Sequence, residues 1–113
     1  MKADQAVAAL AALAQEHRLA LFRLLVQAGE KGLAAGAIAE ALAIPNSSLS
    51  FHLTQLRAAG LIEQRREHRS IIYRAHYSAM NALLTYLMEN CCAGTGCDPE
   101  PACLVQQEEG KSL

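Results

Sequence analysis

The chain has 113 residues, a formal net charge of −1 and four cysteines, and 52% of its residues are hydrophobic. This length corresponds to one domain, and the apolar content excludes a largely disordered chain. No apolar run approaches the roughly 18 residues of a membrane span, and the Ala-rich run at residues 6–14 makes a poor signal peptide. We therefore expect a cytoplasmic protein without a membrane partner.

The first two predicted elements are helices. Residues 4–14 are apolar on nearly every face, which predicts a helix buried against another subunit. Residues 18–27 place Leu21, Leu24 and Leu25 at spacings of three and four, as an amphipathic helix does. Gly29 and Gly32 are expected to end that helix.

Two short helices joined by a tight turn follow. Residues 34–43 predict a third helix, which Pro45 ends because proline disfavours helical dihedrals in the residue before it. Asn46 or Ser47 is expected to cap a fourth helix that runs to about Ala59. Its inward stripe is predicted to be Leu49, Leu53 and Leu56.

The second half predicts a β-hairpin and a last helix. Residues 61–66 and 69–75 are β-like runs around Glu67 and His68, and this turn lacks glycine although His tolerates positive φ better than most residues. Residues 77–90 return to a helical pattern. The expected fold is mainly α with a small hairpin: a winged helix-turn-helix of five helices over residues 1–92, followed by a flexible tail over residues 93–113.

The fourth helix has a polar face opposite its leucine stripe. Short polar groups there suit base edges and phosphates, and an exposed Phe can contact a thymine methyl. The alternative is that the Ser/Asn cluster only caps the helix. The predicted DNA-contacting residues of this helix are Asn46, Ser47, Ser48, Ser50, Phe51 and Thr54.

The charge is unevenly distributed along the chain. Residues 46–75 carry five Arg against two Glu, whereas residues 91–113 carry one Lys against four acidic residues. The hairpin arginines Arg65, Arg66 and Arg69 suit phosphate or minor-groove contacts, or else are solvated surface charges. The mid-chain basic segment favours double-stranded operator DNA as a partner.

These segments together resemble one family. The run from Asn46 to Leu53, then Ala59-Gly60-Leu61-Ile62 and the hairpin residues Arg65-Arg66-Glu67, is similar to the ArsR/SmtB family of metal-responsive repressors. The resemblance covers roughly residues 8–90. It implies a homodimer built on the first and last helices, operator binding in the metal-free state, and release when an inducer binds.

The chain also departs from that family. Many members carry a Cys-x-Cys pair at the start of the third helix, where this chain has Ala34 and Gly36. The last helix offers only His76 and Glu89, without the ligand pattern of zinc-sensing members. Phe51 stands where a recognition-helix His is common, and His68 replaces the usual glycine of the wing tip.

The cysteines lie together near the C-terminus, at positions 91, 92, 97 and 103. Thiolates prefer soft, thiophilic ions. Neighbouring helical residues point about 100° apart, so the last helix must end or fray for the first two sulfurs to bind one ion. Alternatively, Cys91 continues the apolar stripe of the last helix and is a small buried hydrophobe.

A subset of the resembled family has a vicinal cysteine pair plus one nearby cysteine at the end of the last helix. The resemblance therefore implies that Cys91, Cys92 and Cys97 bind trivalent arsenic or antimony as the inducer. Cys103 is left open as a fourth ligand, a substitute or a bystander.

Other functions of the tail stay open at this point. The same repressor fold would serve a Cd²⁺ or Zn²⁺ sensor or a thiol-based redox sensor. A redox enzyme or metal carrier is a further class, but the chain has no Cys-x-x-Cys and no visible nucleophile–base pair, so we expect no catalysis.

Overall fold

The computed structural model describes residues 1–94. Over these residues the chain forms five α-helices, a three-stranded antiparallel sheet and two short 3-10 turns. In chain order the elements are α1 (Ala3–Leu13), α2 (Glu16–Ala28), η1 (Gly29–Lys31), β1 (Leu33–Ala34), α3 (Ala35–Leu42), α4 (Asn46–Ala58), β2 (Ile62–Glu67), β3 (Ser70–Ala75), α5 (Tyr77–Met88) and η2 (Cys91–Gly94). The predicted winged helix-turn-helix with five helices is confirmed.

Helix α2 begins two residues earlier than the leucine spacing predicts. The side chain of Gln15 accepts a hydrogen bond of 2.9 Å from the backbone N–H of Arg18, which satisfies one of the free donors at a helix start. The helix ends where expected, because Gly29 has a φ of 79° that side-chain-bearing residues rarely adopt.

The turn between α3 and α4 uses Ala43 in the left-handed conformation, with a φ of 55°. Pro45 is the N-cap of α4, and Asn46 is already its first helical residue. The predicted capping by Asn46 or Ser47 is therefore wrong, since no side chain caps this helix. The predicted inward stripe is confirmed, with Leu49, Leu53 and Leu56 all at most 4% exposed.

The sheet has the strand order β1-β3-β2. Its first strand, β1, is absent from the sequence prediction because two residues carry no periodicity; Leu33 pairs with Tyr73 of β3. The hairpin turn lies one residue later than predicted, with Glu67 opposite Ser70, so the loop is His68-Arg69. His68 has a φ of 58°, which fits the tolerance expected of histidine.

Helix α5 is shorter than the predicted span to residue 90. It ends at Met88, followed by an extended Glu89 and by Asn90 with a φ of 57°. Leu83 is buried in the core, whereas Leu87 on the predicted apolar stripe is 55% exposed. The stripe therefore covers more surface than this single chain buries.

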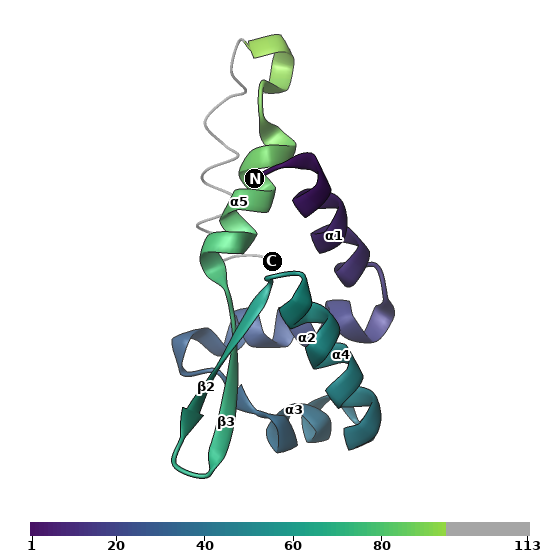
Figure 1. Cartoon of the computed structure of the whole chain (residues 1–113), viewed down its shortest axis with the longest axis vertical. Helices are drawn as coiled ribbons and strands as arrows, with labels where there is room; N and C mark the ends of the chain where they lie inside the picture. The colour runs from purple at the N-terminus through teal and green to yellow at the C-terminus, as the bar shows by residue number, and fades with distance from the viewer. Residues whose placement is uncertain (95–113) are drawn as a thin grey trace.

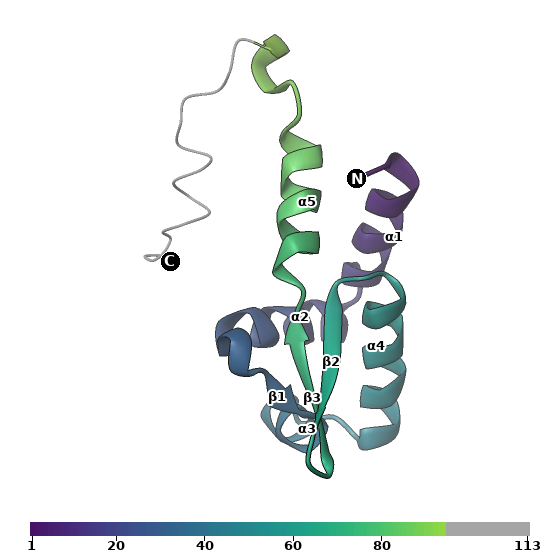
Figure 2. The same ribbon diagram turned by 60° about the vertical axis from the view of Figure 1, so that its left-hand side comes forward.

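The helices α1 and α5 lie side by side at one end of the molecule, and the hairpin tip and the start of α4 lie at the other (Figures 1 and 2). The core between these ends is built from all five helices and the sheet, with Leu21, Leu25 and Ile38 fully buried. Within the described part of the chain, no helix is both long and apolar enough to cross a membrane.

Candidate DNA interface

The first turns of α4 present a polar surface. Asn46, Ser47, Ser48 and Ser50 are exposed, and none of their side chains forms a hydrogen bond with another residue in the described range 1–94. Because these groups do not cap the helix, their donors and acceptors face solvent. The helix N-terminus adds partial positive charge, which favours phosphate.

Two other predicted contact residues lie farther along α4. Phe51 is 56% exposed, which leaves its ring available for an apolar contact with a base. Thr54 is exposed, but its hydroxyl donates a hydrogen bond of 2.9 Å to the carbonyl of Ser50, so only its acceptor lone pairs remain free. The predicted face of α4 is thus exposed as one continuous surface.

The three hairpin arginines are not equivalent. Arg66 and the loop residue Arg69 are exposed and form no ion pair within residues 1–94. Arg65 instead donates hydrogen bonds to the Glu67 carboxylate at 3.1 Å and to the carbonyls of Glu30 and Lys31 at 3.3 and 3.1 Å. Its guanidinium therefore fastens the hairpin to η1.

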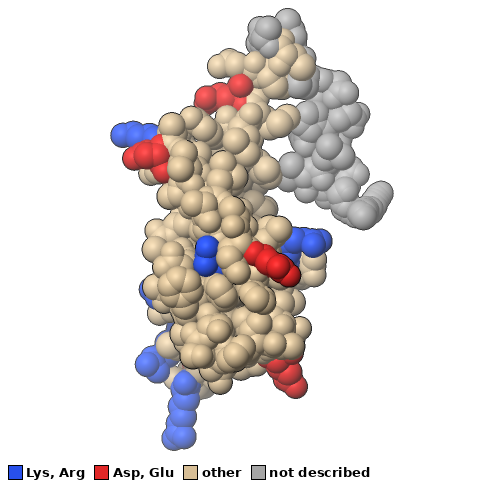
Figure 3. All heavy atoms as spheres, turned by 90° about the vertical axis from the view of Figure 1, so that its right-hand side faces the viewer, with Lys and Arg blue, Asp and Glu red and all other residues tan. Residues whose placement is uncertain are grey.

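A second arginine braces the same hairpin. Arg74 pairs with Glu63 across the β2–β3 register at 3.1 Å and with Glu30 at 3.5 Å. From the sequence, Arg74 is only one of the five arginines of the basic segment 46–75, because its acidic partners are identifiable only once the strand register is known. Basic side chains project from the end of the molecule where the hairpin tip lies (Figure 3).

The inward face of α4 contains one polar side chain. His52 is 8% exposed, and its Nδ1 lies 3.4 Å from Nη1 of Arg18 on α2. Burial, followed by the nearby charges of Arg18 and His17, lowers the pKa of His52. In the sequence, the position of His52 three residues after the inward-facing Leu49 predicts a partly buried packing residue. A buried histidine needs a hydrogen-bond partner, but no local pattern identifies Arg18 as that partner.

Cys91 and Cys92 lie at the opposite end from the hairpin tip. Cys91 is half-buried and Cys92 is exposed, and both belong to η2 just after α5 (Figure 1). Cys97 and Cys103 lie outside the described residues, as does most of the predicted tail. Among residues 1–94 no three His, Cys, Asp or Glu side chains gather in a metal-binding group.

Comparison with known proteins supports a helix-turn-helix fold and a role in transcription regulation. A family model described as a helix-turn-helix domain matches residues 13–65. The HTH-type transcriptional regulator YgaV of Escherichia coli (strain K12) is 32% identical over 90 residues, which cover 80% of this chain and 89% of YgaV. The nodulation protein NolR of Rhizobium meliloti is 33% identical over 87 residues, covering 77% of this chain and 69% of NolR.

Several solved structures of similar proteins share this fold. An ArsR-like transcriptional regulator from Rhodococcus sp. RHA1 matches with a TM-score of 0.69 at 24% identity, covering 97% of this chain and 96% of its own. The homodimeric winged helix-turn-helix domain of Mb0332 from Mycobacterium bovis, described as a possible ArsR-family regulator, gives 0.64 at 25% identity, covering 97% and 89%. Reduced HlyU from Vibrio cholerae N16961 gives 0.58 at 31% identity, covering 79% and 90%. The chain therefore belongs to the helix-turn-helix transcriptional regulators, and it shares its winged helix-turn-helix fold with ArsR-like regulators.

Proposed function

We propose that this protein is a transcriptional repressor that binds an inverted-repeat operator as a homodimer and releases it when cysteine thiolates bind trivalent arsenic or antimony. The observation that carries the DNA-binding part is the exposed polar surface at the start of α4, where the side chains of Asn46, Ser47, Ser48 and Ser50 form no hydrogen bond within the described residues. Two such helices in a dimer would read successive major grooves about one helical turn apart.

The dimer is supported by apolar surface at the α1/α5 end. Val7 and Leu10 of α1 are 64% and 43% exposed, and Leu84, Leu87 and Met88 of α5 are 38%, 55% and 42% exposed. Apolar side chains of this size on two adjacent helices favour burial against a second copy. Mb0332, which shares this fold, is described as homodimeric.

The inducer site is supported by the backbone at the end of α5. The helix stops before the cysteines, and the positive φ angles of Asn90 and Cys92, 57° and 58°, turn the chain away from helical geometry. Cys91 and Cys92 therefore do not continue α5 but lie in the short turn η2 that follows it. Trivalent arsenic takes three thiolates, so the proposed site takes Cys97 as its third ligand.

The test begins with the DNA. Full-length protein is used to select duplexes from a random-sequence pool, and the affinity for the selected duplex is measured by fluorescence anisotropy in a reducing buffer. Arsenite, antimonite, methylarsenite, Cd²⁺ and Zn²⁺ are then added separately. We expect arsenite or antimonite to release the wild-type protein and to fail with the Cys91→Ser, Cys92→Ser and Cys97→Ser variants, each of which still binds DNA without inducer.

The Cys103→Ser variant is the matched control, because it removes a thiol from the same tail without removing the proposed triad. Arsenite release that survives all three triad substitutions would overturn the proposed site. Release by Cd²⁺ or Zn²⁺ alone would assign the protein to a divalent-metal sensor instead.

A second candidate is a thiol-based redox sensor. It is favoured by the adjacent cysteines and by the similarity to HlyU, whose structure is described in a reduced form. In that case oxidant, and not arsenite, releases the DNA, and added reductant restores binding. The same anisotropy experiment therefore separates the two candidates.

A further inference from the structure

Arg18 connects three helices through one side chain. It lies in the first turn of α2, where its backbone N–H donates to the Gln15 side chain. Its Nε donates a hydrogen bond of 2.7 Å to the carbonyl of Ala12, in the last turn of α1. Its Nη1 reaches Nδ1 of His52, in the middle of α4, at 3.4 Å. The guanidinium thus joins the end of α1 to the middle of α4.

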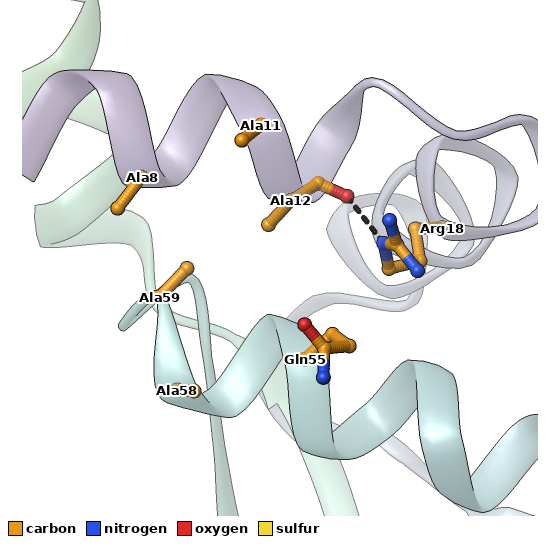
Figure 4. A pocket seen from close by; sticks show the side chains of 7 residues that line it. All are labelled: Ala8, Ala11, Ala12, Arg18, Gln55, Ala58 and Ala59. Atoms are coloured by element: carbon orange, nitrogen blue, oxygen red, sulfur yellow. Dashed lines mark hydrogen bonds between the residues drawn. The ribbon is translucent and has the colours of Figure 1, made fainter.

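The surface between α1 and α4 is hollowed beside this connection. A hollow of about 340 Å³ lies between α1 and α4 beside Arg18. Figure 4 shows Ala8, Ala11 and Ala12 of α1 facing Gln55 and the end of α4 across it, with Arg18 closing one side. Methyl groups on opposite sides of a hollow make few van der Waals contacts, so the apolar packing of α1 comes from its buried face, which includes Ala9 and Ala12, and not from across the hollow.

The hydrogen bonds of Arg18 therefore help to fix the position of α4 relative to α1. A guanidinium suits this task because its fixed geometry lets two nitrogens donate to two different acceptors at once. His52 can accept from Arg18 only when Nδ1 carries no proton, which places the proton of the neutral ring on Nε2.

Among the described residues, the charged or titratable groups beside His52 are Arg18 and His17, and neither is a carboxylate. From α2 it faces Arg18 and the ring of His17, whose centroid is 5.6 Å away. On α1, the Ala12 carbonyl accepts a hydrogen bond from the same Arg18 side chain. On α4 itself, the Phe51 ring lies edge-on to the His52 ring, with the ring centroids 5.7 Å apart. None of the ion pairs formed within residues 1–94 includes Arg18, His17 or His52.

We propose that the Arg18–His52 pair is the positioning link between α1 and α4, and that it opens when His52 is protonated. This inference rests on the proposed function, in which α4 reads DNA and α1 belongs to the dimer interface. A proton on Nδ1 removes the acceptor and places a second cation beside the guanidinium. Nothing in the described cluster offsets that charge, so α4 loses its fixed position relative to α1.

The first test needs no DNA. The ¹⁵N and ¹³C chemical shifts of the His52 ring in the full-length protein report its tautomer and its titration. We expect the Nε2-protonated tautomer at about pH 7.5, and chemical-shift changes in α1 and α4 residues that follow the His52 titration. An Nδ1-protonated ring, or a titration that leaves α1 unaffected, would overturn the proposal.

The second test measures binding to the selected operator at about pH 7.5 and about pH 5.5. All proteins carry His68→Gln, because a protonated wing-tip histidine would strengthen phosphate binding and mask the effect. We expect acidification to weaken binding about tenfold, a typical coupling, in this background, and His52→Asn to abolish that loss. Asn retains an acceptor oxygen at the Nδ1 position but cannot be protonated.

Two matched controls isolate the link. His76→Asn alters a histidine that contacts the Gly60 carbonyl and not Arg18, so it should leave the acid effect unchanged. Arg18→Lys keeps the charge but cannot make both bonds, and should weaken binding about tenfold already at about pH 7.5. Arg23→Lys, at an exposed position of the same helix, should have no effect.

The outcomes separate this inference from the function on which it rests. If the wild-type protein selects no DNA, the proposed function fails while the NMR titration still tests the link. If DNA binds but His52→Asn keeps the full acid effect, or Arg18→Lys binds like the wild type, the link is refuted and the function stands. Thermal melting of each variant at both pH values confirms that the measured protein is folded.

Discussion

Replacement of Gly32 by Ala is expected to disturb the attachment of the wing. Gly32 lies between η1 and β1, with a φ of 68° and a ψ of −168°. A Cβ there would press against the backbone carbonyl of Tyr73 and lie 2.9 Å from Cγ2 of Ile72, both in β3. The Tyr73 carbonyl cannot move away without disturbing the β1–β3 pairing, in which Tyr73 is the partner of Leu33.

The expected cost has two parts. A residue with a side chain in this backbone region costs about 1–3 kcal/mol, and overpacking against a fixed neighbour costs about 1–3 kcal/mol more. Gly29→Ala is the matched control, since Gly29 has nearly the same conformation, φ 79° and ψ −161°, but no atom within 4 Å of the added methyl group. The Gly29→Ala variant should therefore lose only the about 1–3 kcal/mol that the backbone conformation costs.

The free energy of unfolding is measured by urea denaturation followed by circular dichroism, at one protein concentration because a dimer's stability depends on it. Gly36→Ala provides a control of opposite sign: it lies in α3 with open space around it, and should stabilise the protein by about 0.5–1 kcal/mol. If Gly32→Ala costs no more than Gly29→Ala, the reasoning from the Tyr73 contact is wrong.

Three further predictions concern α4 and its surroundings. Ala43→Gly should stabilise the protein by up to about 1 kcal/mol in urea denaturation, because Ala43 is held at a φ of 55° that glycine adopts without strain; a loss of stability would contradict this. Phe51→Ala should weaken operator binding in anisotropy while changing the unfolding free energy by less than about 1 kcal/mol, whereas Leu53→Ala, at a position 4% exposed, should cost about 2–5 kcal/mol. The free energy of unfolding should also fall as the pH drops below 6.5, the ordinary pKa of histidine. His52 has a lowered pKa in the folded state, so the unfolded chain takes up the proton first; its contribution is complete above 6.5 and is lost as the pH falls through the folded-state pKa. In a pH series of urea denaturations, His52→Asn should reduce this dependence, and an unchanged slope would exclude His52 as its source.

The periodic elements of this protein were predictable because their signals are local. The spacing of Leu49, Leu53 and Leu56 alone predicts both the helix and its buried side, and the exposed polar face of α4 follows from the same geometry. Glycine and proline near the helix ends similarly identify where most helices stop. The end of α5 was missed by two residues because no glycine or proline marks it and the residues after Met88 are still compatible with a helix.

Tertiary structure alone decided which charged residues are free to meet DNA. The sequence presents Arg65, Arg66 and Arg69 as equivalent, but the pairing of β1 with β3 brings η1 beside the hairpin, and Arg65 is then held by its carbonyls. In the same way, 34 residues separate Arg18 from His52, and only the crossing of α2 and α4 makes them partners. Periodicity along a helix or strand determines which side of an element is buried, whereas contacts between distant segments determine what each buried polar group meets.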